Sequence, residues 1–318
     1  MEFLIKKTTE LTVQEITSIC QLFGTVFAGH SKTVECFKEE FLHTALGYSF
    51  HAMMVEGREI VGAHSLIPCD YLYGGNKVLV AFSVDTMIKQ SHRDFFNLKD
   101  LVDLTESTAK KAGVKFIFGF PNDNSYLVLK KGLKYKDIGR LNTYVYPYRI
   151  GGIKHNLSFL NPISKACTRL LELISMFIWS HKEATFLLDK NRKLYDQYRY
   201  QWFSGKYKIV SLLGFNFVYR IENYEGIRTV FLADLDKISS FNVAKAVSYI
   251  RKCDGENFDL LIYVGLLPCS GVPLVKIPRR LEPKNFNFVG KLLDKKDMDE
   301  RWFDINNWNV NLSCYDLI

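Results

Sequence analysis

Strand and helix signals alternate most clearly from Lys77-Val-Leu-Val-Ala-Phe-Ser-Val-Asp-Thr-Met-Ile88 onward. This alternating, β-branched apolar run predicts a long strand. Polar residues 89–93 interrupt it, and residues 94–113 then carry apolar side chains three and four positions apart, as in a helix that ends at a glycine. Residues 114–118 predict a short buried strand. A strand, a helix and a strand joined in this way indicate a parallel βαβ unit.

The helix expected at residues 94–113 starts close behind the long strand. Its first backbone N–H groups have no acceptor inside the helix, and the helix dipole adds partial positive charge there. This end therefore suits a phosphate group. A crossover helix without any ligand is the other interpretation, and the unit alone favours neither.

Composition and charge narrow the class of protein. A chain of 318 residues with 47% hydrophobic residues is typical of about two globular domains. The net charge of +8 suits an anionic ligand, but the cations are dispersed and no basic arm for nucleic acid is present. The 7 cysteines show no metal-site spacing, so we expect reduced thiols, no metal and a cytoplasmic location.

No segment predicts a membrane span. The longest apolar stretch, Leu170 to Trp179, is far shorter than the roughly 20 residues that a bilayer requires. Residues 1–6 predict a strand rather than a cleavable leader. We therefore expect a soluble protein.

The rest of the first half predicts a strand, two helices and two strands, with one more strand after the βαβ unit. The ranges are 3–6, 12–27, 34–46, 51–55, 59–73 and 138–146. A connector of residues 151–192 follows, with an amphipathic helix that contains Cys167, Leu170, Leu171, Ile174, Phe177 and Ile178. We expect this helix to pack on a domain, and a position on a membrane surface is the alternative.

The second half repeats the first. Strands are predicted at 208–222 and 226–235, a helix at 240–253 and a buried strand at 258–264, with further strand-like segments at 286–293 and 308–318. Such internal repetition indicates a duplicated unit. We expect three parts: 1–150, the connector 151–192, and 193–318.

This pattern resembles the GNAT superfamily of acyl-CoA N-acyltransferases, in the tandem form with two GNAT-like halves. The phrases that carry the resemblance are Ile60-Val-Gly62, Val84-Asp-Thr-Met-Ile88 and Gly119-Phe-Pro-Asn122, which look like bacterial members, some tied to surface-polysaccharide synthesis. The halves also resemble N-myristoyltransferases and Fem-type aminoacyl transferases. The resemblance implies an α+β fold with a mixed sheet in each half.

The resemblance implies acetyl-CoA as cosubstrate. Its pantetheine arm would meet the backbone of Thr86, Met87 and Ile88, with Asn122 near the next helix. Its diphosphate would lie on the turn formed by Arg93, Asp94, Phe95, Phe96 and Asn97. Related turns carry glycines. In this chain Phe96 and Leu98 stand where those glycines are expected, and Asp94 stands at another position that is often glycine. Phe96 would crowd the phosphate and Asp94 would repel it, so a scaffold without coenzyme binding is the alternative.

The resemblance also implies direct transfer, in which a tyrosine gives a proton to the departing thiolate. The matching position here is Lys130, and Tyr126, one helical turn earlier, is the substitute. Asp85 is a candidate base or amine anchor, or a strand residue hydrogen-bonded to a loop. We expect His64 to be a satisfied polar residue rather than a base. The C-terminal carboxylate, at Ile318, is a further candidate base.

Taken together, the sequence predicts an acetyl-CoA-dependent N-acetyltransferase that acts on an amine of a small molecule or an amino sugar. We expect the second half to shape the acceptor groove without binding coenzyme, because it lacks the arginine turn. A catalytically silent scaffold and a Fem-type aminoacyl-tRNA-dependent transferase are the alternatives, the latter disfavoured by the dispersed cations. The acceptor, the acyl chain length and the oligomeric state are left open.

Overall fold

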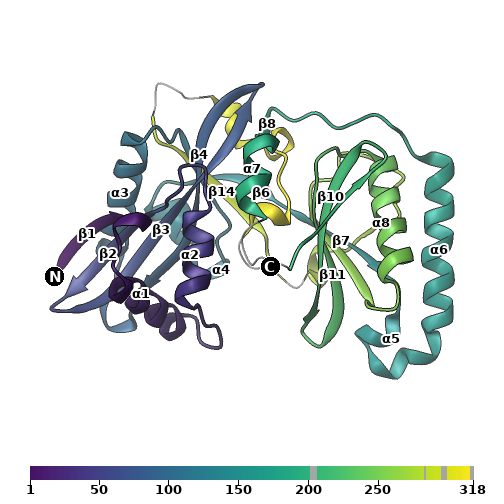
Figure 1. Cartoon of the computed structure of the whole chain (residues 1–318), viewed down its shortest axis with the longest axis horizontal. Helices are drawn as coiled ribbons and strands as arrows, with labels where there is room; N and C mark the ends of the chain where they lie inside the picture. Colours follow the sequence, from purple (N-terminus) through teal and green to yellow (C-terminus); the bar gives the residue numbers. More distant parts are fainter. Residues whose placement is uncertain (201–205, 283, 295–298, 316–318) are drawn as a thin grey trace. The chain divides into compact units, whose positions relative to one another are not determined.

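The computed structural model describes residues 1–200, 206–282, 284–294 and 299–315 (Figure 1). The chain folds into two compact units. Unit 1 comprises Met1–Arg140, Leu187–Ser204 and Phe286–Trp308, and unit 2 comprises Leu141–Phe186, Gly205–Asn285 and Asn309–Ile318. The units are therefore interleaved in the sequence, whereas the ranges expected from the sequence were contiguous.

Unit 1 is built on a mixed sheet with the strand order β1-β2-β3-β4-β5-β14-β6, and β8 pairs with β3. Strands β4 and β5 are parallel and are joined by helix α3, which confirms the predicted βαβ unit. The strands are β1 (Glu2–Lys7), β2 (Phe50–Glu56), β3 (Glu59–Tyr73), β4 (Asn76–Ile88), β5 (Phe116–Gly119), β6 (Lys136–Arg140), β8 (Leu188–Lys190) and β14 (Asn287–Leu292).

Helices cover both faces of this sheet. They are α1 (Val13–Val26), α2 (Val34–Leu42), α3 (Phe95–Lys111), α4 (Asp123–Leu127), which continues into a π-helical turn at Val128–Gly132, and α7 (Arg192–Arg199). Alternate residues of β2 point to opposite faces. Phe50 packs in a cluster with Val102 of α3, whereas the ring of His51 contacts the ring of Phe41 of α2.

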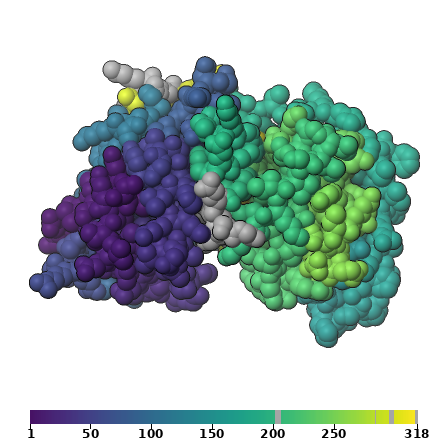
Figure 2. Space-filling model, viewed as in Figure 1, coloured from purple at the N-terminus to yellow at the C-terminus, as the bar shows by residue number. Residues whose placement is uncertain are grey.

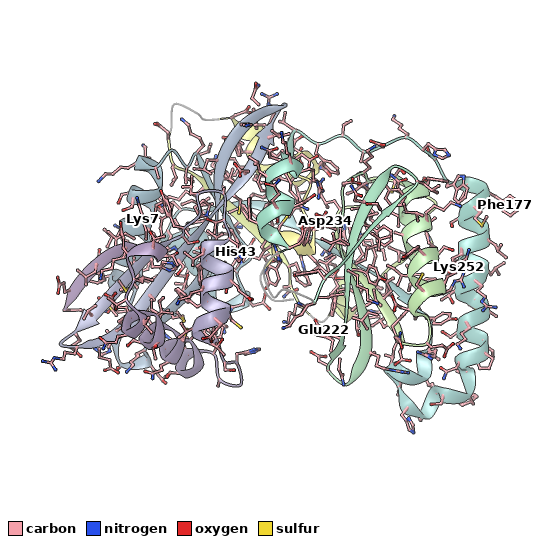
Figure 3. All side chains as sticks on the ribbon, viewed as in Figure 1. Lys7, His43, Phe177, Glu222, Asp234 and Lys252 are labelled. Atoms are coloured by element: carbon pink, nitrogen blue, oxygen red, sulfur yellow. The ribbon has the colours of Figure 1, made fainter. Side chains whose placement is uncertain are left out.

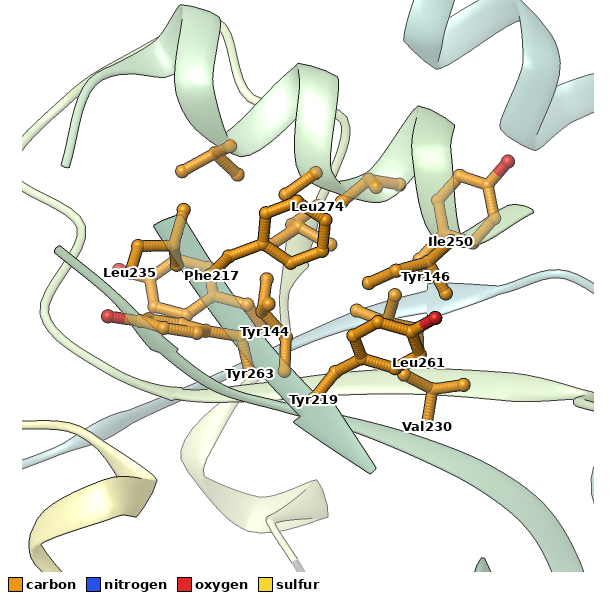
Figure 4. Packing of buried hydrophobic residues seen from close by; sticks show 14 of the residues in the cluster. Tyr144, Tyr146, Phe217, Tyr219, Val230, Leu235, Ile250, Leu261, Tyr263 and Leu274 are labelled. Carbon is orange, nitrogen blue, oxygen red and sulfur yellow. The ribbon is translucent and has the colours of Figure 1, made fainter. Parts of the chain in front are cut away.

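Unit 2 repeats the order of elements around a second mixed sheet, β13-β7-β12-β11-β10-β9. Its strands are β7 (Asn142–Pro147), β9 (Lys208–Leu212), β10 (Phe215–Tyr224), β11 (Ile227–Leu235), β12 (Leu260–Gly265) and β13 (Val275–Lys276), and helix α8 (Ser240–Asp254) joins the parallel pair β11 and β12. Aromatic rings of the sheet, among them Phe217 and Tyr219, pack beneath α8 near Ile250 (Figure 4), and Val247 of α8 belongs to the same cluster.

Two predicted strands take a different place in the structure. The range 138–146 was expected as one strand, but it divides at Leu141 into β6 of the first sheet and β7 of the second. The range 286–293 forms β14, which inserts between β5 and β6 of the first sheet instead of completing the second half. Alternation of apolar residues satisfies either core equally well, so it carries no information on which sheet a strand joins.

Two further expectations are wrong. The predicted strand at 308–318 is replaced, as far as Tyr315, by loops and a short helical turn at Leu312–Cys314. The amphipathic helix of the connector forms α6 (Asn161–Ile178), after the short α5 (Ile150–Ile153), but its apolar face does not pack on a domain. Leu170, Ile174 and Phe177 are exposed instead. None of the helices in the described part of the chain is long and apolar enough to cross a bilayer.

Candidate active site

The end of β4 is irregular because it carries a β-bulge. Ser65 of β3 pairs with Val84 and Ala63 pairs with Met87, so Asp85 and Thr86 together stand opposite the single residue His64. Asp85 has a φ of 47°, in the left-handed region that aspartate tolerates better than most residues. Bulges of this kind turn side chains out of the regular ladder and are frequent beside active sites.

The bulge lies where β4 loses its second neighbour. The parallel pairing of β4 with β5 ends at Phe82 and Phe118, and beyond this pair β4 is bonded, among the residues that the structure describes, to β3 alone. The predicted coenzyme residues Thr86, Met87 and Ile88 belong to this last part of β4. A strand edge without a neighbour presents backbone N–H and C=O groups to which an extended ligand can bind.

Asp85 belongs to a buried ionic cluster. Its Oδ2 atom lies 2.5 Å from Nζ of Lys32, and Oε2 of Glu40 lies 2.7 Å from the same nitrogen. Burial alone would lower the pKa of Lys32, but the two carboxylates outweigh burial and raise it above its ordinary value. Lys32 is therefore a fixed cation in this structure, and Asp85 is bound to the loop that carries it.

Aromatic rings close the cluster from two sides. The ammonium of Lys32 lies 4.8 Å from the ring centre of Phe23 and 5.0 Å from that of Phe41, distances typical of cation–π contacts. Sequence reasoning missed both Lys32 and Glu40. Lys32 stands in a loop and gave no signal, whereas Glu40 interrupts the apolar face of α2 between Phe37 and Phe41, and this could have indicated a buried partner.

His64 faces the bulge as a neutral side chain. Its Nδ1 atom lies 2.9 Å from Oγ1 of Thr86, and its Nε2 atom is buried without a hydrogen-bond partner in the described part of the chain. Burial lowers the pKa of His64 to about 3. An imidazole with so low a pKa is a weak base, so His64 supports the bulge rather than removing protons.

The residues predicted to bind the diphosphate form the start of α3. Asp94 is the N-cap, and its carboxylate accepts a hydrogen bond of 2.9 Å from the backbone N–H of Asn97. The amide of Asn97 donates to the carbonyl of His92 at 2.9 Å. Arg93 donates to the carbonyl of Ile88 at 3.2 Å, which ties the helix start to the end of β4. The cap leaves the backbone amides of the first two helical residues, Phe95 and Phe96, without an acceptor inside the helix.

The two phenylalanines of this turn are placed differently. Phe96 is 74% exposed, so its ring points into solvent. The ring of Phe95 lies against Gly132, where a Cβ atom would come within 2.3 Å of Cε2 of Phe95. Gly132 therefore permits this ring to pack on the turn that follows α4.

Tyr126 and Asn122 both lie at the start of the next helix. Oδ1 of Asn122 caps α4 by accepting from the backbone N–H of Ser125 at 2.9 Å. The hydroxyl of Tyr126 donates to Asp137 at 2.6 Å and accepts from Lys130 at 3.1 Å. Asp85 and Tyr126 thus belong to two separate polar clusters. Ile318, the other candidate base, lies outside the described residues.

Comparison with solved structures places this geometry in a known fold. A GCN5-related N-acetyltransferase from Anabaena variabilis aligns with 92% of this chain and 73% of its own, at a TM-score of 0.59 and 12% identity. A probable N-acyltransferase from Enterococcus faecalis aligns at a TM-score of 0.56 and 10% identity, again over 92% of this chain and 73% of its own. Eis1 from Mycobacterium abscessus aligns at 0.53 and 14% identity, over 92% of this chain and 74% of its own. No family model matches the chain, and neither does a curated protein sequence.

The chain therefore has the fold of the GCN5-related N-acetyltransferases, or GNAT fold. This confirms the resemblance and the α+β class predicted from the sequence.

Proposed function

We propose that this protein is an acetyl-CoA-dependent N-acetyltransferase that acts in the cytoplasm on an amine of a small molecule or an amino sugar. The observation that carries the proposal is the free edge of β4 at Thr86–Ile88, which leads directly to the start of α3. An extended thioester arm can lie along such an edge while its phosphates meet the helix start. The fold shared with N-acetyltransferases supports the same reaction class.

The residues at this place suit the coenzyme. Acetyl-CoA would supply an acetyl group as a thioester, which amines attack readily. The backbone of Thr86, Met87 and Ile88 would bind the pantetheine arm, with Asn122 beside it. The amides of Phe95 and Phe96 would bind the diphosphate, because the Phe96 ring, which meets the Phe95 ring edge to face, is 74% exposed.

Two polar clusters have distinct roles in this proposal. In direct transfer the neutral acceptor amine attacks the thioester carbon, the C–S bond breaks, and the nitrogen passes one proton to water while the sulfur gains one. Tyr126 donates the proton to sulfur, and the ammonium of Lys130 stabilises the phenolate that remains. Asp85 and Glu40 carry two negative charges against the single positive charge of Lys32, so the cluster attracts the ammonium form of the acceptor, which loses one proton to water before it attacks.

The proposal is tested by titrating the full chain with acetyl-CoA in a calorimeter and by measuring its melting temperature with and without acetyl-CoA. We expect binding and a rise in melting temperature, followed by thiol release when a panel of amines and amino sugars is added. Absence of both heat and thermal shift would overturn the proposal.

A catalytically silent binding protein is the second candidate. The carboxylate of Asp94 at the helix start and the ion pair that occupies Asp85 favour it. The same experiment separates the two: a silent protein binds the coenzyme or an amine but releases no thiol from any mixture of them.

A further inference from the structure

Helix α6 packs on unit 2 through polar side chains and leaves its apolar side chains exposed. The side chains that it buries are polar: Thr168, Glu172 and Ser175 are each at most 8% exposed. Glu172 accepts hydrogen bonds from Arg251 at 2.7 Å and from Tyr146 at 2.5 Å. The helix is thus attached through a buried polar network, where an ordinary surface helix would use an apolar stripe.

The outward face of α6 is apolar along its whole length. Ile163, Cys167, Leu170, Ile174 and Phe177 recur at intervals of three and four residues, so they form one stripe. Leu170 is 56% exposed and Phe177 is 88% exposed. Phe177 points away from the sheet and from α8 (Figure 3). In the space-filling view the teal atoms of α6 lie along one margin of unit 2 (Figure 2).

The charges around this stripe are mostly positive. From residue 150 to residue 183 the cations are Lys154, Lys165, Arg169 and Lys182, and the acids are Glu172, which is buried against Arg251, and the exposed Glu183 at the end of the segment. A second copy of the chain would bring cations against cations at this face, which is unfavourable. A bilayer with anionic lipids offers both an apolar layer for the stripe and negative charge for its margin.

We propose that α6 is an interfacial helix that binds this protein to the surface of a bilayer containing anionic lipids. The stripe enters the boundary between headgroups and acyl chains, while Lys154, Arg169 and Lys182 contact headgroup phosphates. The helix lies in the plane of the surface, since no described helix can cross a bilayer. The inference does not depend on the proposed acetyltransferase activity.

Vesicle sedimentation with the full chain tests the proposal. We expect the protein to sediment with vesicles of phosphatidylcholine and phosphatidylglycerol, to stay in solution with phosphatidylcholine alone, and to be released by salt. The double substitution Leu170→Asp and Phe177→Asp should weaken binding by at least about tenfold. The control Val13→Asp, at an exposed apolar position in the first turn of α1, should bind like the unsubstituted protein.

A second measurement, the rate of thiol labelling, uses the unsubstituted protein. Cys167 lies within it and is exposed, and Cys253 is an exposed thiol on α8. Anionic vesicles should slow maleimide labelling of Cys167 relative to Cys253. The proposal is overturned if both thiols react at unchanged relative rates with vesicles present, or if the double substitution abolishes a dimer while the unsubstituted protein ignores vesicles.

Discussion

Lys32 and Asp85 form an ion pair of 2.5 Å at the residue where β4 turns into the left-handed backbone conformation. Glu40 binds the same ammonium at 2.7 Å, so that one cation is shared by two carboxylates. The side chains of Lys32, Asp85 and Glu40 are only 11%, 7% and 3% exposed. The pair therefore joins the loop after α1 to the bulge and stabilises both.

Substitution of Lys32 by Met tests this arrangement. The change leaves Asp85 and Glu40 buried without their counter-ion, and breaking a buried pair in this way costs about 3 to 5 kcal/mol of unfolding free energy. Denaturant unfolding followed by circular dichroism measures the loss. Lys99→Met is the control, because Lys99 pairs with Asp103 at the surface, where ion pairs contribute little. Equal stabilities for the two variants would contradict the prediction.

Asp94→Asn should strengthen coenzyme binding. Asparagine caps helices as well as aspartate does, so α3 keeps its start, but the negative charge beside the proposed diphosphate is removed. We expect the Kd for acetyl-CoA, measured by calorimetry, to fall about two- to fivefold. Asp100→Asn removes a charge from the exposed middle of the same helix and serves as control. A Kd that rises in the Asp94 variant would place the diphosphate elsewhere.

Two buried histidines should make the stability depend on pH. Burial lowers the pKa of His51 and of His64 to about 3 from the ordinary value of 6.5. Between these values the unfolded chain binds protons that the folded chain does not, so stability is full above about pH 6.5 and falls as the pH decreases. The slope is at most about 1.4 kcal/mol per pH unit for each histidine.

Urea unfolding at several pH values between about 7 and 5 checks this sign and slope. His64→Asn should flatten the slope, because one of the two groups is removed. His155→Gln, at an exposed position, should keep the slope of the unsubstituted protein. A His64 variant with the unchanged slope would show that another group dominates the titration.

Tyr126→Phe should lower kcat for acetyl transfer and leave the Kd for acetyl-CoA nearly unchanged, since the hydroxyl is needed only for the proton. General acid catalysis contributes about 100-fold or more, which sets the expected loss. Asp137→Asn keeps a hydrogen-bond acceptor for Tyr126 and should have the smaller effect. An unchanged kcat in the Tyr126 variant excludes it as the acid.

The sequence was sufficient for the parallel unit of unit 1, because the apolar period of residues 77–118 differs sharply between strand and helix. It missed the turn that divides the predicted strand 208–222 into β9 and β10. It was insufficient for pairings between distant segments. Nothing in Asn287–Leu292 indicates that it inserts between β5 and β6, since any apolar strand fits an open edge.

For the candidate site, the sequence predicted which backbone segments form it, but it did not predict which side chains contact one another there. The positions of Thr86–Ile88 and of the helix start after Arg93 follow from the strand and helix boundaries. The bulge at Asp85 and the partner Lys32 do not, because a loop lysine reaches a distant aspartate only through the tertiary fold. For α6, the period of apolar residues was correctly found, but a period alone cannot say whether the apolar face points inward.

Unit 2 contains a pair of parallel strands that corresponds to β4 and β5 of unit 1, which raises the number of coenzyme sites per chain as a question for measurement. In unit 2 the parallel strands β11 and β12 also separate, after the pair Phe231 and Ile262. The segment 309–314 lies between their ends: Asn311 pairs with Gly265 of β12, and its side-chain amide donates to Asp234 of β11 at 2.8 Å. Figure 3 labels Asp234 within this unit.

Segment 309–314 thus takes the place in unit 2 that the thioester arm is proposed to take in unit 1. The side chains of Asn311 and Ser313 are buried there, at 0% and 1% exposure, and the segment already contacts the ends of both strands. We therefore expect calorimetry to give one acetyl-CoA per chain, in unit 1. A stoichiometry of two acetyl-CoA molecules per chain would contradict this prediction and show that unit 2 also accepts the coenzyme.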